Sequence, residues 1–307
     1  MHVSIIEPLG VEEQLVHTLM AEVDCTYDYY TERSVDPQVL ANRGAQADVI
    51  VVANAPMPAE VLGACRRLRM LSVAFTGLDH VDLDFCDERG IEVVNCSGYS
   101  TEAVAEEAFG LALSLYRHLL ECDRRTRTGG DKSGLVFREL RGKTLGIVGN
   151  GAIAQRVMEL GRAFGMRLLC WARTERPLDG VTYVSLDDLC RQSDVLTLHV
   201  PAVPQTRHLI GAEQLAIMKP DAVLINTARG PVVDTDALVK ALEQGIIAGA
   251  GLDVFDTEPP LDPSLPILHA PHTALAPHIG FATQEALDER VRLAIDHVAT
   301  FLSSAKA

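Results

Sequence analysis

The sequence of 307 residues lacks several features, and each absence excludes a class of protein. No apolar stretch reaches the roughly 18 residues that a membrane-spanning helix requires. The apolar run near the start, residues 3–6, is too short for a signal peptide, so none is expected. The seven cysteines include no C-x-x-C pair, and we interpret them as reduced thiols of a cytoplasmic protein.

Positive charge is also scarce. The chain has 27 lysine and arginine residues against 42 aspartate and glutamate residues, which gives a net charge of −15 at pH 7. Nucleic acids and anionic membrane surfaces attract basic proteins, so neither is expected as a partner. Hydrophobic residues make up 48% of the chain, enough for sizeable cores. At about 150 residues per domain, the length predicts two domains.

Short apolar runs alternate with helical patterns along most of the chain. In the first hundred residues the expected strands are 3–6, 49–52, 70–74 and 91–94, and the expected helices are 11–20, 37–44, 58–66 and 81–89. A long helix over 101–120 and a polar loop over 123–143 precede strands at 144–148, 167–171, 194–198, 222–226 and 247–252, and a final amphipathic helix covers 283–303. This alternation predicts an α/β protein with mostly parallel sheets covered by helices on both faces.

A glycine-rich turn follows the apolar strand that ends at residue 148. Gly149, Gly151 and Ala154 have the spacing G-x-G-x-x-G/A, and a helical pattern follows them. Gly149 permits a tight turn, Gly151 lets a pyrophosphate approach, and Ala154 lets the helix pack closely on the strand. The start of the helix presents backbone N–H groups and a positive dipole end to phosphates. The pattern predicts a dinucleotide site, although a glycine-rich turn of another α/β domain would look similar.

The residue that selects between NAD and NADP is expected about 20 residues after the glycines. Residues 170–176 read C-W-A-R-T-E-R, so Ala172 stands where NAD enzymes carry an acid. Without a carboxylate, a 2′-phosphate is not repelled, and the guanidinium of Arg173 can pair with it. The sequence therefore favours NADP. NAD remains open, because Arg173 could be a solvated charge and Glu175 is close.

Three further motifs follow in the second half of the chain. They read NTARG at 226–230, LDVFDTEPP at 252–260 and APHIG at 276–280. The first two leave expected strands, and ligands of parallel sheets bind beyond the carboxyl ends of the strands, so Arg229 and Glu258 are candidate site residues. His278 lies in the third motif, before which no strand is expected. Each motif alone is weakly informative, because a single arginine is often a surface charge and a single histidine is often structural.

Taken together and in this order, the motifs resemble those of the D-isomer-specific 2-hydroxyacid dehydrogenases. That family includes phosphoglycerate dehydrogenase and the glyoxylate/hydroxypyruvate reductases. The resemblance runs nearly end to end and also covers TGLDHVD at 76–82, STEAVAE at 100–106, GKTLGIVGNGAIA at 142–154 and HVPAVPQTRHLI at 199–210. It implies two doubly wound, Rossmann-like domains with a cleft between them. Residues 1–99 with 284–307 would form a flavodoxin-like substrate domain, and residues 100–283 the dinucleotide-binding domain.

The resemblance also implies a catalytic trio. Arg229 matches the arginine that holds the substrate carboxylate and polarises the C2 oxygen, His278 matches the acid/base, and Glu258 matches its carboxylate partner. The residue types suit these roles, because imidazole exchanges protons near neutral pH and a neighbouring carboxylate stabilises imidazolium. The implied reaction transfers a hydride between NAD(P)H and the C2 carbonyl of a small unphosphorylated 2-oxo acid, which gives a D-2-hydroxy acid.

The remaining implied residues line the cofactor and the substrate. The cofactor set is Gly149, Asn150, Gly151, Ala152, Ile153, Arg173, Thr174, His199, Val200, Pro201, Thr206, Thr227, Ala228, Asp253, Gly280 and Val104. Asp253 matches the residue that bonds the nicotinamide amide. The substrate set is Asn54, Thr76, Gly77 and Leu78, with Arg229 and His278. No metal is expected; the alternative is a site of His269, His272 and His278.

Two alternative functions share much of this pattern. A phosphoglycerate dehydrogenase needs cations for the substrate phosphate, but residues 52–57 and 72–76 contain no lysine or arginine. Arg66, Arg67 and Arg69 precede strand 70–74, at the end away from the expected cleft, although the 123–138 segment of a second subunit could supply a cation. The other alternative is a non-catalytic, NAD(H)-sensing corepressor-like protein, which keeps the same trio. The acidic charge and the lack of long disordered extensions favour the enzyme.

Relatives in this family are usually homodimers joined through the cofactor domain. The apolar helix expected over 101–120 suits such an interface. A helix buried within its own domain would show the same pattern.

Overall fold

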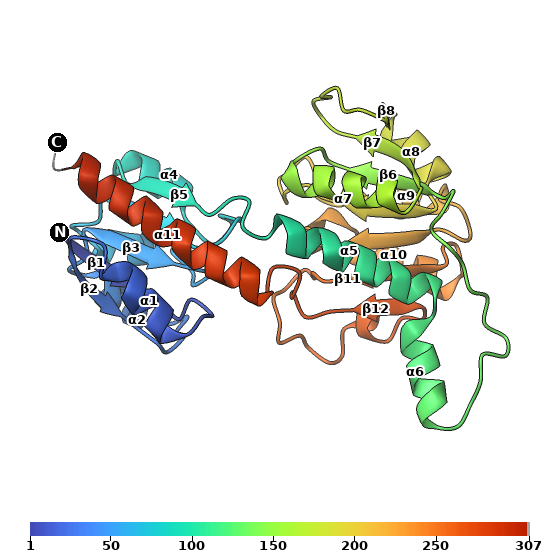
Figure 1. Cartoon of the computed structure of the whole chain (residues 1–307), viewed down its shortest axis with the longest axis horizontal. Helices are drawn as coiled ribbons and strands as arrows, with labels where there is room; N and C mark the ends of the chain where they lie inside the picture. Colours follow the sequence, from blue (N-terminus) through green and yellow to red (C-terminus); the bar gives the residue numbers. More distant parts are fainter. Residues whose placement is uncertain (306–307) are drawn as a thin grey trace. The chain divides into compact units, whose positions relative to one another are not determined.

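The computed structural model describes residues 1–305 and divides into two compact units. Unit 1 comprises Met1–Ser100 and the described residues from Ala282 to Ala305, and unit 2 comprises Thr101–Phe281 (Figure 1). Their sheets have five and seven strands, and every paired strand is parallel to its neighbours. The predicted α/β class with two parallel sheets is therefore confirmed.

Unit 1 is built on the strand order β2-β1-β3-β4-β5. Its strands are β1 (His2–Ile5), β2 (Thr26–Tyr29), β3 (Val49–Val52), β4 (Met70–Val73) and β5 (Glu92–Asn95). Its helices are α1 (Glu13–Met20), α2 (Pro37–Gly44), α3 (Ala59–Ala64), α4 (Leu83–Glu88) and α11 (Gln284–Ser304). The strand order reverses between β1 and β3, which makes the carboxyl ends of these two strands the expected place for a ligand. The C-terminal helix α11 packs on β4, where Ser72 Oγ donates to the Ala294 carbonyl at 2.9 Å.

Unit 2 has the strand order β12-β11-β10-β9-β6-β7-β8. Its strands are β6 (Thr144–Val148), β7 (Arg167–Trp171), β8 (Val181–Tyr183), β9 (Val195–Leu198), β10 (Val223–Asn226), β11 (Gly249–Leu252) and β12 (Thr273–Leu275). Its helices are α5 (Thr101–Tyr116), α6 (Leu119–Arg127), α7 (Ala152–Ala163), α8 (Leu186–Gln192), α9 (Ala212–Ala216) and α10 (Thr235–Glu243), with short 3-10 turns η1 (Gly230–Val232) and η2 (Pro266–Leu268). Here the strand order reverses between β6 and β9, next to the glycine-rich turn.

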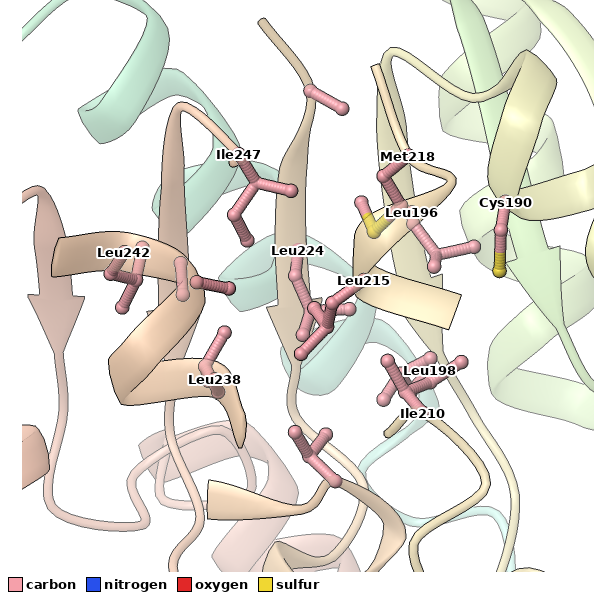
Figure 2. Packing of buried hydrophobic residues seen from close by; sticks show 14 of the residues in the cluster. Cys190, Leu196, Leu198, Ile210, Leu215, Met218, Leu224, Leu238, Leu242 and Ile247 are labelled. Carbon is pink, nitrogen blue, oxygen red and sulfur yellow. The ribbon is translucent and has the colours of Figure 1, made fainter. Parts of the chain in front are cut away.

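Two apolar layers cover the faces of this sheet. α5 and α7 pack on one face with Leu145, Ile147 and Val195, whereas α8, α9 and α10 pack on the other. Figure 2 shows the second layer, where Leu224 of β10 lies among Leu215 and Leu238 of the covering helices. Because both faces are buried, the central strands are continuous apolar runs, which is why the sequence revealed them.

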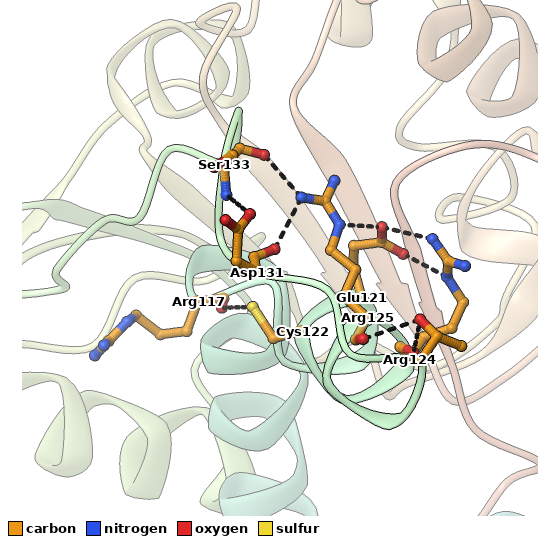
Figure 3. A network of polar contacts seen from close by, with 8 residues as sticks. Arg117, Glu121, Cys122, Arg124, Arg125, Asp131 and Ser133 are labelled. Carbon is orange, nitrogen blue, oxygen red and sulfur yellow. Dashed lines mark hydrogen bonds and ion pairs between the residues drawn. The ribbon is translucent and has the colours of Figure 1, made fainter.

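The expected helix over 101–120 and the expected loop over 123–143 are both wrong in part. α5 ends at Tyr116, His118 adopts a left-handed conformation with φ 48°, and α6 then begins at Leu119. No glycine or proline marks this break. α6 is polar, and ion pairs between neighbouring turns stabilise it. Glu121 pairs with Arg124 at 2.8 Å and with Arg125 at 2.6 Å (Figure 3).

Three strands were also missing from the expectation: β2, β8 and β12. β2 reads TYDY with alternating exposed and half-buried positions, and β8 and β12 have three residues each. All three lie at sheet edges, where one side has no neighbouring strand. Edge strands need no continuous apolar run, so the pattern that identifies buried strands is absent.

No helix of residues 1–305 is long and apolar enough to cross a membrane.

Candidate active site

The glycine-rich turn joins β6 to α7. Gly149 has φ 109°, and a Cβ there would lie 2.4 Å from the backbone oxygen of His199. Gly151 differs, because its φ is −71° and an added Cβ would meet no described atom within 4 Å. Neither backbone conformation nor protein packing requires glycine at 151. The close approach of a bound group, as predicted for a pyrophosphate, is the explanation that fits.

The start of α7 is suited to an anion. Gly151 occupies the N-cap position and provides no side-chain cap, so the first-turn N–H groups at Ala152 and Ile153 have no capping side chain. Ala154 is 1% exposed, and an added Cβ at Gly161 would lie 2.7 Å from Leu145 Cδ2. Small residues therefore bring α7 close to the sheet, as the spacing predicted.

The turn after β7 lies beside the glycine-rich turn. Asn150 Nδ2 donates to the Thr174 carbonyl at 2.7 Å, which joins the two turns. Arg173 and Thr174 are exposed. Within residues 1–305, the Arg173 side chain makes no hydrogen bond or ion pair, so its guanidinium can pair with a ligand.

Buried and partly buried polar side chains surround the exits of β9 and β10. His199 Nε2 lies 2.9 Å from Thr197 Oγ1, and burial lowers the pKa of His199 to about 3, which keeps the imidazole neutral. Thr206 Oγ1 donates to the Pro201 carbonyl and closes the loop after His199. The Thr227 hydroxyl is buried without a partner among the described residues. An orphaned buried hydroxyl is costly, so this atom fits a site for a bound polar group.

The turn that carries Arg229 is held by Asn226, which the sequence motif contained but to which no role was given. Asn226 is 1% exposed; its Oδ1 accepts from Ala228 N at 3.0 Å and its Nδ2 donates to the Arg229 carbonyl at 2.9 Å. An asparagine that closes a turn at a strand end was the available signal. A Cβ at Gly230 would fall 2.0 Å from the Phe255 backbone, so the loops after β10 and β11 are in direct contact.

Glu258 and His278 form a hydrogen-bonded pair. Glu258 Oε2 lies 2.7 Å from His278 Nδ1. The histidine side chain is 14% exposed and the glutamate side chain 67% exposed. The Phe281 ring meets the imidazole at 85° with the ring centres 5.3 Å apart, and His278 adopts the left-handed φ of 60°. Glu258 therefore fixes the orientation of the imidazole ring through Nδ1.

Asp253 holds the loop in which His278 lies. Its two oxygens accept from Ile279 N at 2.7 Å and from Gly280 N at 2.8 Å, and the residue is 1% exposed. Burial raises the pKa of Asp253, although these amides act in the opposite direction. Burial and the nearby Asp253 carboxylate also raise the pKa of Glu107. The carboxylate that was expected to bond a nicotinamide amide therefore has a structural task of its own. Val104 packs against the same loop, because an added Cβ at Gly280 would lie 3.7 Å from Val104 Cγ2.

Of the expected substrate residues, Asn54 and residues 76–78 belong to unit 1, whereas Arg229 and His278 belong with the rest of the trio to unit 2. Asn54 is exposed in the loop after β3, and Thr76, Gly77 and Leu78 follow β4. The two loops are linked, since Met57 N donates to the His80 carbonyl at 2.7 Å. All four substrate residues thus lie beyond the carboxyl edge of the unit 1 sheet.

A metal site finds no support in residues 1–305. No group of three histidine, cysteine, aspartate or glutamate side chains gathers there as metal ligands. His269, one of the three histidines of the alternative reading, instead places Nε2 at 2.7 Å from the Pro263 carbonyl.

The sequence profile of the D-isomer specific 2-hydroxyacid dehydrogenase, NAD binding domain, matches residues 109–280. The chain is 40% identical over 277 residues to the glyoxylate reductase of Aeropyrum pernix, which covers 86% of this chain and 82% of that protein. It is 40% identical over 246 residues to the hydroxypyruvate reductase of Thermotoga maritima, which covers 78% of this chain and 80% of that protein.

A solved structure shows the same likeness. The D-lactate dehydrogenase of Aquifex aeolicus, complexed with NAD and lactic acid, superposes with a TM-score of 0.87 and 33% identity over 99% of this chain and 96% of that one. The chain belongs to the D-isomer specific 2-hydroxyacid dehydrogenases, as its motifs indicated. It is an oxidoreductase that acts on the CH–OH group of 2-hydroxy acids with a nicotinamide cofactor.

Proposed function

We propose that this enzyme reduces a small unphosphorylated 2-oxo acid, of the size of glyoxylate, hydroxypyruvate or pyruvate, to the D-2-hydroxy acid with NADPH. The observation that carries the proposal is the pair of His278 and Glu258, whose Nδ1 and Oε2 are 2.7 Å apart. Glu258 lies on the loop after β11 and His278 on the loop after β12, beyond the carboxyl edge of the unit 2 sheet. The loop after β11 contacts the turn that carries Arg229. The relatives named glyoxylate reductase and hydroxypyruvate reductase support the substrate class.

The proposed mechanism assigns one task to each member of the trio. The Arg229 guanidinium binds the substrate carboxylate and polarises the C2 carbonyl. The nicotinamide cofactor, when bound, supplies the hydride to C2. His278, as imidazolium, gives its Nε2 proton to the C2 oxygen, so that the C=O bond becomes CH–OH. Glu258 stabilises the imidazolium and orients the ring through Nδ1. In the oxidative direction His278 accepts the same proton.

We propose NADPH as the preferred cofactor. Ala172 places no carboxylate at the position that repels a 2′-phosphate, and the exposed guanidinium of Arg173 can pair with that group. Thr174, which is bound to Asn150 through its carbonyl, places the turn against the glycine-rich loop. The open space at Gly151 and the orphaned Thr227 hydroxyl support a bound dinucleotide at the edge of unit 2.

An unphosphorylated substrate is supported by the positions of the nearby arginines. Residues 52–57 and 72–76, which follow β3 and β4, contain no cation. Arg67 pairs with Asp48 at 3.0 Å, and the Arg69 guanidinium lies 5.4 Å from the centre of the Phe301 ring. Both arginines precede β4, at the amino edge of the sheet. A phosphate bound beyond the carboxyl edge would lack them.

The division of labour follows from the placement of these residues. In the proposal unit 2 holds the cofactor and supplies Arg229 and His278, and unit 1 supplies Asn54 and residues 76–78 as contacts to the 2-oxo acid. The enzyme is proposed to be a homodimer joined through unit 2. Its support is an apolar surface at the junction of α5 and α6, where Leu119, Leu120 and Val136 are 51%, 60% and 65% exposed beside a hollow of about 480 Å³. The free thiols support a reducing, cytoplasmic location.

The decisive experiment is a set of initial rates for glyoxylate, hydroxypyruvate, pyruvate and 3-phosphohydroxypyruvate with NADPH and with NADH. We expect turnover of the short acids with NADPH and a product of D configuration. The product from hydroxypyruvate is assigned by chiral chromatography. Absence of turnover with every acid and both cofactors would overturn the proposal in favour of a non-catalytic dinucleotide sensor.

A further inference from the structure

Unit 1 contains an almost fully buried carboxylate next to its expected ligand position. Glu7 follows β1 and is 1% exposed. Beside it runs the loop after β3, which begins at Ala53. β1 and β3 are the neighbouring strands between which the strand order of this sheet reverses. Glu7 therefore lies where parallel sheets of this kind bind their ligands.

A single oxygen of Glu7 gathers three successive backbone amides. Glu7 Oε1 accepts from the N–H groups of Ala53, Asn54 and Ala55 at 2.8, 2.8 and 2.7 Å. Consecutive N–H groups that converge on one point form a concave anion site, and here the chain's own carboxylate fills it. These charge-assisted bonds offset the cost of burying the carboxylate. The backbone of Asn54 is thereby held in place while its side chain stays exposed.

Hydrogen bonds also connect the loop after β3 to the loop after β4, which carries Thr76, Gly77 and Leu78. Met57 N donates to the His80 carbonyl at 2.7 Å, and Asp82 N donates to the Met57 carbonyl at 3.0 Å. At the other end of that loop, Asn95 Nδ2 donates to the Thr76 carbonyl at 2.6 Å. The loops after β3 and β4 therefore form one linked platform, with Glu7 at one end and Asn95 at the other.

We propose that Glu7 is a positioning residue for the 2-oxo acid. Its carboxylate holds the loop that carries Asn54 in the conformation that binds substrate. Because Glu7 occupies the three amides, they do not bind the substrate carboxylate, which is left to the loop after β4 and to Arg229. This inference rests on the proposed function, in which Asn54 and residues 76–78 contact the substrate. Loss of Glu7 then weakens substrate binding without slowing proton or hydride transfer in the bound complex.

The test compares steady-state kinetics of Glu7→Ala and Glu7→Gln with the wild type, using glyoxylate and NADPH. We expect the KM of Glu7→Ala for glyoxylate to rise by at least about tenfold, because three bonds to a charged acceptor are lost. The kcat and the dissociation constant of NADPH, measured by fluorescence, should change by less than about threefold. The amide oxygen of Glu7→Gln can still accept from the loop, so its KM should rise less.

Asp48 provides the matched control. Asp48 Oδ2 also accepts from a backbone amide, His2 N, at 2.7 Å, and the carboxylate pairs with Arg67. Unlike Glu7, however, Asp48 lies before β3, at the amino edge of the same sheet. Asp48→Asn should lower the melting temperature and leave the KM for glyoxylate unchanged. If Glu7 were only structural, its variants would behave in the same way.

The outcomes separate this inference from the proposed function. A wild-type KM in folded Glu7→Ala, or an equal rise in Asp48→Asn, would overturn the positioning role while turnover of 2-oxo acids stands. A wild-type enzyme without turnover on any 2-oxo acid would overturn the proposed function and this inference with it.

Discussion

Glu258 Oε2 lies 2.7 Å from His278 Nδ1, although 20 residues separate the two along the chain. Glu258 is on the loop after β11 and His278 follows β12, and these two strands are neighbours in the sheet. The parallel pairing brings both carboxyl ends to one edge, so the acid/base pair is a product of strand order.

This pair predicts a loss of reductive efficiency when the carboxylate is removed. In the proposed mechanism Glu258 orients the His278 ring through Nδ1. In Glu258→Gln a charge-assisted hydrogen bond is lost, so kcat/KM for glyoxylate reduction should fall by roughly 10- to 100-fold. Asp256→Asn is the control, since Asp256 lies on the same loop but bonds Thr235 Oγ1 at 2.9 Å. A wild-type kcat/KM in Glu258→Gln would remove Glu258 from this role.

The position of Arg173 leads us to expect a preference for NADPH over NADH. A charged hydrogen bond to the 2′-phosphate contributes about 1.5–3 kcal/mol, so Arg173→Ala should lower kcat/KM for NADPH by roughly 10- to 100-fold. The value for NADH should change by less than about threefold, because NADH has no 2′-phosphate. Arg191→Ala serves as the control, since Arg191 lies on α8 and pairs with Asp188 at 3.2 Å. Equal efficiency of both cofactors in the wild type would contradict the assignment.

The arginine-free loops of unit 1 predict discrimination against a phosphorylated acid. A phosphate without charged partners keeps its desolvation cost. We expect kcat/KM for hydroxypyruvate to exceed that for 3-phosphohydroxypyruvate by at least about tenfold under matched conditions. A preference for the phosphorylated acid would identify a phosphoglycerate dehydrogenase instead.

Asp194 is expected to make a pH-dependent contribution to the free energy of unfolding. Burial opposes its ionisation, but bonds from Thr144 N at 2.7 Å and Lys219 Nζ at 2.9 Å hold the pKa of Asp194 below its ordinary value of 3.8. A lowered folded pKa stabilises the protein above the unfolded value, and this contribution is lost as pH falls through the folded value. Asp194→Asn should therefore lower the free energy of unfolding at pH 7 by about 1–3 kcal/mol.

The measurement is urea unfolding of Asp194→Asn and wild type between about pH 7 and pH 3. The difference between the two proteins should shrink below about pH 4, where protonation removes the wild-type advantage. A difference that stays constant over this range would show that ionisation of Asp194 is not its cause.

The apolar surface at the α5–α6 junction predicts the oligomeric state. Light scattering should give a mass of twice the 33.3 kDa chain, and Leu120→Asp should shift the protein to the monomer. Leu83→Asp is the control, because Leu83 is also exposed, at 44%, but lies in unit 1. A monomeric wild type, or a dimer that persists in Leu120→Asp, would contradict an interface at this surface.

What the sequence by itself determined is local. Strands such as β3 and β10 are buried on both faces, so they appear as continuous apolar runs, and the spacing of Gly149, Gly151 and Ala154 is fixed within a single turn. The edge strands β2, β8 and β12 and the break at His118 left no such signal, because edges need no apolar run and no glycine or proline marks the break.

Only the tertiary structure decided which side chains act together. Asp253 reaches the amides of Ile279 and Gly280, and Glu7 reaches three amides 46 to 48 residues away. Nothing in the spacing of these residues encodes the contacts. The contacts arise because parallel strands that are far apart in the sequence have their carboxyl ends at the same edge of a sheet. A buried side chain at that edge then contacts the loop that the strand order places beside it.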